Sequence, residues 1–402
     1  KLELDETAIM SDPLLRSYQL YVYRIRNFLF LGGVLPSSSI RPVVSYCTAF
    51  FTTLICCGLT VHNSILFIVL HELINSFSPY FIKAMCFIVN REGLIELHET
   101  LDEMFENELK QSPKTRSRLL SLLHNFDRPS YILSFSIGAT ISTYVIPPTL
   151  TILYQSIHYV ETKKYWLPFP AKFPWTIEGG SFLYQVHYFY EIVVAWVLLF
   201  TNCGVDALFG FYIFQMASLM RAMTYRLKNP QPNEDRVEVL RSCVDKHRRL
   251  IRCRNILQKV YGPIILYLML TNGVVICALI FQTKEMTLGK AVLFVFFMLL
   301  KIVQTFMYAW YGGNVATESD KFRQGLYLSD WTGKNSKKLK PELIITMLQK
   351  PMNVTILRFF CVSVDMFTKI MNTAVSYFFL LKTLDERELQ FTSLISNATT
   401  FQ

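Results

Sequence analysis

Long apolar runs alternate with charged connectors along most of the chain. Each run is close to the roughly 20 residues that an α-helix needs to cross a bilayer. The pattern therefore predicts an all-α membrane protein with seven transmembrane helices. We place these helices at residues 41–62, 65–90, 130–158, 187–219, 260–282, 288–316 and 354–382.

Positive charge is distributed unevenly among the segments that join these helices. Lys and Arg are concentrated in residues 1–41, 91–128, 221–259 and 317–350, whereas the connectors between those segments carry few or none. Because Lys and Arg are retained on the cytoplasmic side of a membrane, we expect the amino end to be cytoplasmic. Seven crossings then place the carboxyl end outside the cell.

Composition supports a multi-pass membrane protein. Hydrophobic residues make up 52% of the 402 residues and charged residues only 17%, which is typical of polytopic membrane chains. The formal net charge of +10 requires no nucleic-acid partner, because basic cytoplasmic loops that face anionic membrane lipid account for it. Residues 1–35 mix acidic and basic residues with short apolar groups, so we expect no cleavable signal peptide.

The chain carries no pattern that predicts catalysis. Its nine cysteines fall almost entirely within predicted spans or the basic connectors, which argues against a disulfide framework. The sequence has no metal-ligand spacing, no Gly-rich phosphate loop and no nucleophile paired with a base. We therefore expect no enzyme activity, no catalytic residue, no metal site and no cofactor.

The basic connectors contain amphipathic helical patterns. Leu94, Leu97, Leu101 and Phe105 recur at three-to-four spacing, which is typical of a helix with one apolar face. Residues 237–244 show a similar pattern. We expect the predicted spans to continue as helices below the membrane, with their apolar faces covered either by neighbouring subunits or by the same chain.

The last predicted helix has one face that mixes polar and aliphatic side chains. Residues at three-to-four spacing share a helix face, and here the polar members lie deeper than the aliphatic ones. Such a face can form a wet lining closed by an apolar ring, which gates by dewetting. Its members are Lys369, Thr373, Ser376, Leu380 and either Thr383 or Leu384.

Charged residues also lie within the predicted spans. Asp365 and Lys369 are one helical turn apart and are expected to pair. Lys83, Asp206 and Lys301 lie at membrane depth as well, where charged groups face a cavity or extend to the interface.

Two motifs in the C-terminal third resemble those of insect odorant receptors. The first resembles the "YxxYGN…ES…Y…W" stretch of that family, and the second, Asn372 to Leu381, resembles its closing "A-x-S-Y-F-x-L-L" signature. The first motif comprises Phe306, Met307, Tyr308, Ala309, Trp310, Tyr311, Gly312, Gly313, Asn314, Glu318, Ser319, Gly325, Leu326, Tyr327 and Trp331.

The resemblance implies an odorant-binding subunit of a ligand-gated, non-selective cation channel. In that family, coreceptor subunits complete a tetramer around one pore that conducts cations, in the membrane of a sensory neuron dendrite. The short connector at residues 221–259 is similar to that of a ligand-tuned subunit rather than the coreceptor. Motif alignment implies that Leu380 and Leu384 form the gate, with Thr383 between them.

The resemblance further implies that a small volatile odorant binds in the outer half of the helices, in an apolar pocket walled by the second, third, fourth and sixth spans. Pro147 and Pro148 are expected to kink or break the third span near the pocket mouth. The candidate ligand-binding residues are Phe77, Phe81, Ile141, Tyr144, Val145, Tyr188, Ile192, Trp196, Val292, Val295 and Phe296.

These expectations divide the chain into functional segments. Residues 1–40 form a cytoplasmic segment, 41–316 hold the first six helices and the pocket, 317–352 form a cytoplasmic anchor, 353–384 form the pore-lining helix and 385–402 form an extracellular tail. Two other classes remain as alternatives. A G-protein-coupled receptor has the opposite orientation, and a secondary transporter has internal repeats, which this sequence lacks.

Overall fold

A computed structural model describes the chain at residues 12–32, 78–158, 164–168, 178–229, 234–282, 288–329, 331, 340–357 and 359–399. The predicted first span and the first half of the second lie outside these residues. The elements are α2 (Pro13–Leu31), α5 (Ser78–Val89), α6 (Arg91–Leu109), α7 (Pro113–Leu120), α8 (Leu123–Ile157), α9 (Phe182–Lys228), α10 (Arg236–Gln282), α11 (Leu288–Tyr327), α12 (Lys340–Leu348), β1 (Thr355–Ile356), β2 (Phe360–Cys361) and α13 (Val364–Thr399).

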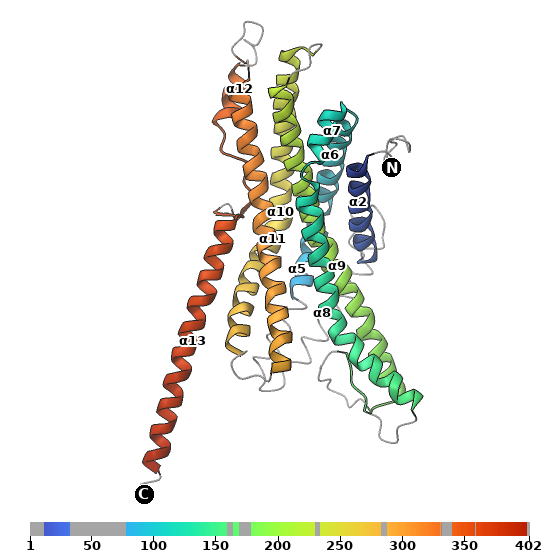
Figure 1. Ribbon diagram of the computed structural model, residues 1–402, viewed down its shortest axis with the longest axis vertical. Helices are drawn as coiled ribbons and strands as arrows, with labels where there is room; N and C mark the ends of the chain where they lie inside the picture. The colour runs from blue at the N-terminus through green and yellow to red at the C-terminus, as the bar shows by residue number, and fades with distance from the viewer. Residues whose placement is uncertain are drawn as a thin grey trace.

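The helices form an elongated bundle with two distinct halves (Figure 1). The short helices α2, α6, α7 and α12 lie toward one end, where α9 also meets α10. At the other end, α8 ends and α9 begins, and α10 ends and α11 begins. Helix α13 extends beyond all four of these helix ends. The basic connectors lie at the end with the short helices, so we call that end the cytoplasmic half and the opposite end the outer half.

Four helical stretches of the described chain are long and apolar enough to cross a membrane. The predicted fourth span falls within the second of these stretches, the predicted third and fifth end one residue beyond the first and third, and the predicted sixth overlaps the last. The helical membrane fold is thereby confirmed, with one short β-hairpin as the exception among the described elements. The stretches are Pro113–Ile157, Phe182–Lys228, Arg236–Phe281 and Val295–Tyr327.

Helix α9 is the centre of the bundle. Every side chain from Cys203 to Met220 is buried, because α9 packs against α2, α7, α8 and α11. A helix that is apolar on all sides is stable only when it is enclosed in this way. Helix α2 covers the cytoplasmic part of α9, where the ring of Tyr18 stacks on Phe105 at 5.1 Å and on Phe211 at 6.3 Å.

The apolar faces of the cytoplasmic half are covered by the same chain. Leu97, Leu101 and Phe105 of α6 are fully buried within the described part, in contact with α9 and α10. Arg249 of α10 also pairs with Glu103 of α6 at 2.5 Å, and hydrogen bonding to this guanidinium lowers the pKa of the Glu103 carboxyl. The amphipathic helices predicted below the membrane are confirmed, and these residues need no neighbouring subunit to bury them.

The chain before α13 differs from the prediction. The predicted seventh helix begins at residue 353 or 354, but β1 and β2 form an antiparallel hairpin in which Thr355 faces Cys361 and Ile356 faces Phe360. The helix begins only at Val364 and runs without interruption to Thr399. The hairpin packs closely because Gly312 of α11 has no side chain, and a Cβ there would lie 2.4 Å from the Val362 carbonyl oxygen.

Candidate functional site

The predicted ligand-binding residues of α8 and α9 lie together in the outer half. Ile141, Tyr144 and Val145 are half-buried on α8. A hydrogen bond of 2.6 Å between the Thr149 and Tyr188 hydroxyls joins α8 to α9. Helix α8 continues through Pro147 and Pro148, so of the predicted kink or break, the break does not occur.

The remaining predicted ligand-binding residues lie in less enclosed positions. On α9, Ile192 is half-buried, and Trp196 is 54% exposed and stacks on Phe200 at 5.5 Å. On helix α11, Val292, Val295 and Phe296 are exposed. Phe77 lies outside the described residues, and Phe81 lies in α5 but its side chain is not described.

Polar side chains from three helices converge at membrane depth. We call this cluster the polar floor, and its members are Lys83, Asn202, Asp206, Lys301, Gln304 and Tyr308.

Asp206 of α9 is the hub of the polar floor. Its carboxylate accepts hydrogen bonds from the Lys83 ammonium of α5 at 2.5 Å and from the Tyr308 hydroxyl of α11 at 2.6 Å. The Gln304 amide donates to the second carboxylate oxygen at 2.8 Å, and Lys83 also donates to Asn202 at 3.0 Å. A buried carboxylate is tolerated because its acceptor positions are occupied in this way.

The polar floor lies on the cytoplasmic side of the predicted ligand-binding residues. Along α9, Asn202 follows Trp196, and along α11, Lys301 follows Phe296. With a rise of 1.5 Å per residue, these steps place the polar groups about 8 to 9 Å deeper in the membrane. Polar side chains therefore lie on the cytoplasmic side of the mainly apolar region that the sequence predicts for the ligand.

The predicted pore residues share the exposed face of α13. Four of these side chains are polar, and the Thr373, Ser376 and Thr383 hydroxyls each donate to a carbonyl of their own helix, at 2.8 to 2.9 Å. All six predicted pore side chains, including those of Leu380 and Leu384, are exposed in the isolated chain. The set consists of Lys369, Thr373, Ser376, Leu380, Thr383 and Leu384.

The opposite face of α13 attaches the helix to the bundle. Ala374 is buried in a small cluster with Ile276 and Cys277 of α10, while Met366 and Ile370 pack against the main core. The helix thus has one face committed to its own chain and another, carrying the pore residues, that is left uncovered.

The expected charge pair of α13 is present. The Lys369 ammonium lies 2.8 Å from the Asp365 carboxylate, with both side chains about three-quarters exposed. The pairing confirms the prediction from their spacing.

Residues of the first motif hold α11 to its neighbours. Tyr311 stacks on Phe126 of α8 at 5.0 Å, and Glu318 accepts a 2.6 Å hydrogen bond from Arg221 of α9. The Ser319 hydroxyl accepts a hydrogen bond of 2.8 Å from the Met352 amide, just before the hairpin. With Tyr308 in the polar floor, the motif links α11 to α8, to α9 and to the segment before the hairpin.

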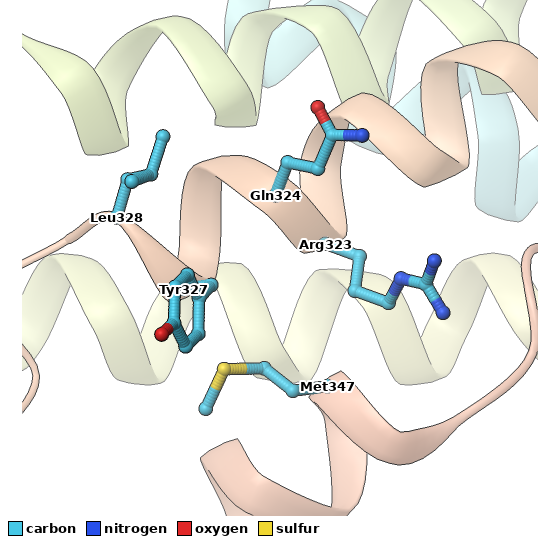
Figure 2. A pocket seen from close by; sticks show the side chains of 5 residues that line it. All are labelled: Arg323, Gln324, Tyr327, Leu328 and Met347. Atoms are coloured by element: carbon cyan, nitrogen blue, oxygen red, sulfur yellow. The ribbon is translucent and has the colours of Figure 1, made fainter.

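An open cavity of about 450 Å³ lies in the cytoplasmic half and contains no predicted ligand-binding residue. Figure 2 shows Tyr327 of α11 and Met347 of α12 beside each other in this cavity. Arg323, a positively charged residue that lines the cavity, pairs with Asp320 at 2.6 Å. The cavity therefore belongs to the contact between α11 and α12 rather than to the outer region described above. Its lining residues are Arg323, Gln324, Tyr327, Leu328 and Met347.

Comparison with known proteins identifies similar chains. The model of a family described as 7tm Odorant receptor matches residues 70–375. Odorant receptor 13a of Drosophila melanogaster is 24% identical over 64% of this chain and 67% of its own length. Odorant receptor 10 of Aedes albopictus is 24% identical over 72% of this chain and 75% of its own. The odorant receptor coreceptor of Anopheles gambiae is 25% identical over only 34% of this chain and 30% of its own.

Solved structures share the fold. The insect olfactory receptor OR5 from Machilis hrabei superposes with a TM-score of 0.71 at 20% identity, and covers 92% of this chain and 99% of its own. The same receptor in complex with eugenol gives a TM-score of 0.67, with 93% of this chain and 100% of that one covered. At this identity, the similarity establishes the fold of the chain.

Proposed function

Because the chain belongs to the 7tm Odorant receptor family, we propose that it is the odorant-binding subunit of a ligand-gated, non-selective cation channel. The odorant is a small volatile apolar molecule, and coreceptor subunits complete a tetramer with a shared pore. The similarity to odorant receptors over about two thirds to three quarters of the chain, against a match of about a third with the coreceptor, supports the role of ligand-tuned subunit. The expected location is the plasma membrane of a sensory neuron dendrite.

The uncovered face of α13 is the observation that carries this proposal. Lys369, Thr373 and Ser376 are exposed on a helix whose other face is packed against α10 and α11. Polar and charged side chains are costly against lipid and face a water-filled path instead. Four such faces, one from each subunit, would enclose that path, and permeant cations would pass along it.

Leu380 and Leu384 would close the path near its outer end. Both are exposed on the same face of α13 as the polar residues. A ring of aliphatic side chains excludes ions because hydrated ions do not shed water into an apolar constriction. In this scheme residues 353–384 form the pore segment, 317–352 the cytoplasmic anchor and 385–402 the extracellular tail.

The odorant would occupy the outer half between the predicted ligand-binding residues of α8, α9 and α11. Apolar odorants form few hydrogen bonds, so shape and buried apolar area supply most of their affinity. The relative from Machilis hrabei, with the same fold, has been solved with eugenol, which supports a small aromatic ligand. Binding would open the gate only to the extent that the ligand prefers the open arrangement.

Whole-cell recording tests the proposal. The chain is expressed in a heterologous cell with an insect coreceptor, and volatile esters, alcohols, terpenes and aromatics are applied while G-protein signalling is blocked. We expect a rapid ligand-evoked cation current that requires both chains. A response that disappears when G-protein signalling is blocked would contradict the channel, and a full response from this chain alone would contradict the obligatory coreceptor.

A further inference from the structure

Two Asn-x-Ser/Thr motifs occur in the sequence, at Asn353–Thr355 and Asn397–Thr399, and neither has proline in the middle position. An asparagine in this pattern accepts an N-linked glycan when it is accessible on the extracytoplasmic side of the membrane. The side of the membrane on which each motif lies therefore decides whether it can be modified.

The first motif belongs to the cytoplasmic half and is held by α10. The Gln258 amide donates hydrogen bonds to the Asn353 carbonyl oxygen at 3.0 Å and to the Thr355 hydroxyl at 2.9 Å. Farther along α10, Asn272 donates to Thr305 of α11 at 3.0 Å, beside the polar floor. Along a helix, the step from Gln258 to Asn272 is about 21 Å. The first motif therefore lies well to the cytoplasmic side of the polar floor.

The second motif lies on the opposite side of the membrane. Helix α13 runs without interruption to Thr399, and its residue Ala374 packs beside Ile276, on the outer side of Asn272 in α10. From Ala374 to Asn397 the helix advances about 35 Å, which exceeds the thickness of about 30 Å of a hydrocarbon core. Figure 1 shows the end of α13 beyond the outer ends of α8, α9, α10 and α11.

Charged residues mark where α13 leaves the membrane. Leu384 is followed directly by residues 385–388, which read Asp-Glu-Arg-Glu. The Lys382 ammonium lies 3.7 Å from the Glu386 carboxylate, with both side chains about half exposed. Because charged side chains are costly in hydrocarbon, the membrane ends near Leu384. The helix then continues for about 20 Å before it reaches Asn397, so the motif stands clear of the lipid surface.

We infer that Asn397 is a site of N-linked glycosylation at the extracellular end of α13, and that Asn353 is not modified. The donor is a lipid-linked oligosaccharide. The side-chain amide nitrogen of Asn397 forms a bond to the anomeric carbon of this sugar and loses a proton, while the bond from that carbon to the pyrophosphate oxygen breaks and the lipid pyrophosphate leaves. The inference requires only the orientation of the chain in the membrane, and it depends neither on the odorant nor on the channel.

The test uses the full-length chain expressed in insect cells. Membranes are treated with peptide N-glycosidase, and the mobility of the chain on a denaturing gel is compared with that of an untreated sample. We expect one step of increased mobility after treatment. Mass spectrometry of the peptide that follows Arg387 should show Asn397 converted to aspartate by the enzyme. A known glycoprotein of the same cells confirms that the enzyme is active.

Variants assign the shift to one motif. Asn397→Gln and Thr399→Ala each remove the motif and are expected to abolish the shift, whereas Thr399→Ser preserves the motif and should keep it. Asn353→Gln is the matched control in the cytoplasmic half and should also keep the shift. Adding Gln390→Asn to Asn397→Gln creates a motif with Thr392, about two turns earlier on α13, and should restore the shift.

Three results would overturn the inference. The first is a wild-type chain without a shift in a sample whose known glycoprotein does shift. The second is a shift that persists in Asn397→Gln or in Thr399→Ala. The third is a shift that is lost in Asn353→Gln, which would assign the glycan to the segment before the hairpin and reverse the orientation of the chain.

Discussion

The ammonium of Lys83 lies 2.5 Å from the carboxylate of Asp206, and both side chains are almost completely buried. The pair joins α5 to α9 and, through Gln304 and Tyr308, to α11. Charges that are buried together are tolerated only while both are present, because removing one leaves the other without compensation in a medium of low dielectric constant.

Asp206→Asn is therefore expected to destabilise the chain by about 3 to 5 kcal/mol. The double variant Lys83→Met with Asp206→Asn removes both charges and retains an acceptor for Gln304 and Tyr308, so it should recover much of the loss. Thermal unfolding in nanodiscs measures both changes.

Glu96→Gln provides the control for this experiment. Glu96 pairs with Arg252 at 2.6 Å, but both side chains are substantially exposed, and exposed pairs contribute little to stability. A double variant that is no more stable than Asp206→Asn would contradict the view that an uncompensated buried charge causes the loss of stability.

Adjacent glycines of α11 give a matched test of the contact with the hairpin. A Cβ at Gly312 would lie 2.4 Å from the Val362 carbonyl oxygen, whereas at Gly313 it would meet nothing within 4 Å. Gly312→Ala must displace the backbone that leads into α13, and we expect a loss of about 1 to 3 kcal/mol. Gly313→Ala should leave the midpoint of thermal unfolding unchanged or raise it, because alanine favours helix more than glycine does.

Both glycine variants can also be examined as channels with the coreceptor. Gly312→Ala is expected to reduce the maximal odorant-evoked current, because the displaced segment precedes the proposed pore helix. Equal stabilities and equal currents for the two variants would show that the close approach at Gly312 is unimportant.

The sequence predicts the parts of this fold that depend on local patterns. Runs of apolar residues located α8 to α11, and the one-turn spacing of Asp365 and Lys369 predicted their pairing. The same reasoning misplaced the start of α13, because Val354 to Val362 is as apolar as a span. The hairpin segment can pack against α11 because Gly312, which is distant in sequence, has no side chain.

The polar floor could not be predicted in the same way. Lys83 and Asp206 are separated by 123 positions, and each alone resembles a charged residue that extends to the membrane interface. The packing of α5, α9 and α11 decides that they meet. Tyr308 belongs to the first motif, but its contact with Asp206 depends on the same packing.

The gate prediction concerns Leu380 and Leu384. If these side chains form the apolar constriction, replacing either with alanine widens it and lets water enter. We expect Leu380→Ala and Leu384→Ala to raise the current in the absence of odorant, measured as the fraction of the maximal evoked current. Val375→Ala is the control, because Val375 is similarly exposed but lies on a different face of α13. A basal current that rises equally in all three variants would mean that α13 is loosened generally.

Lys369 provides a test of whether the polar part of the α13 face lines the ion path. A positive charge beside a cation path raises the barrier to permeation, and the neighbouring Asp365 at 2.8 Å compensates only part of that charge, because both groups are exposed. Lys369→Gln should therefore increase the single-channel conductance, and Asp365→Asn should decrease it. Both effects should shrink at high ionic strength, because mobile ions screen exposed charges. Conductances that do not change in either variant, at low as well as high salt, would place this face of α13 away from the pore.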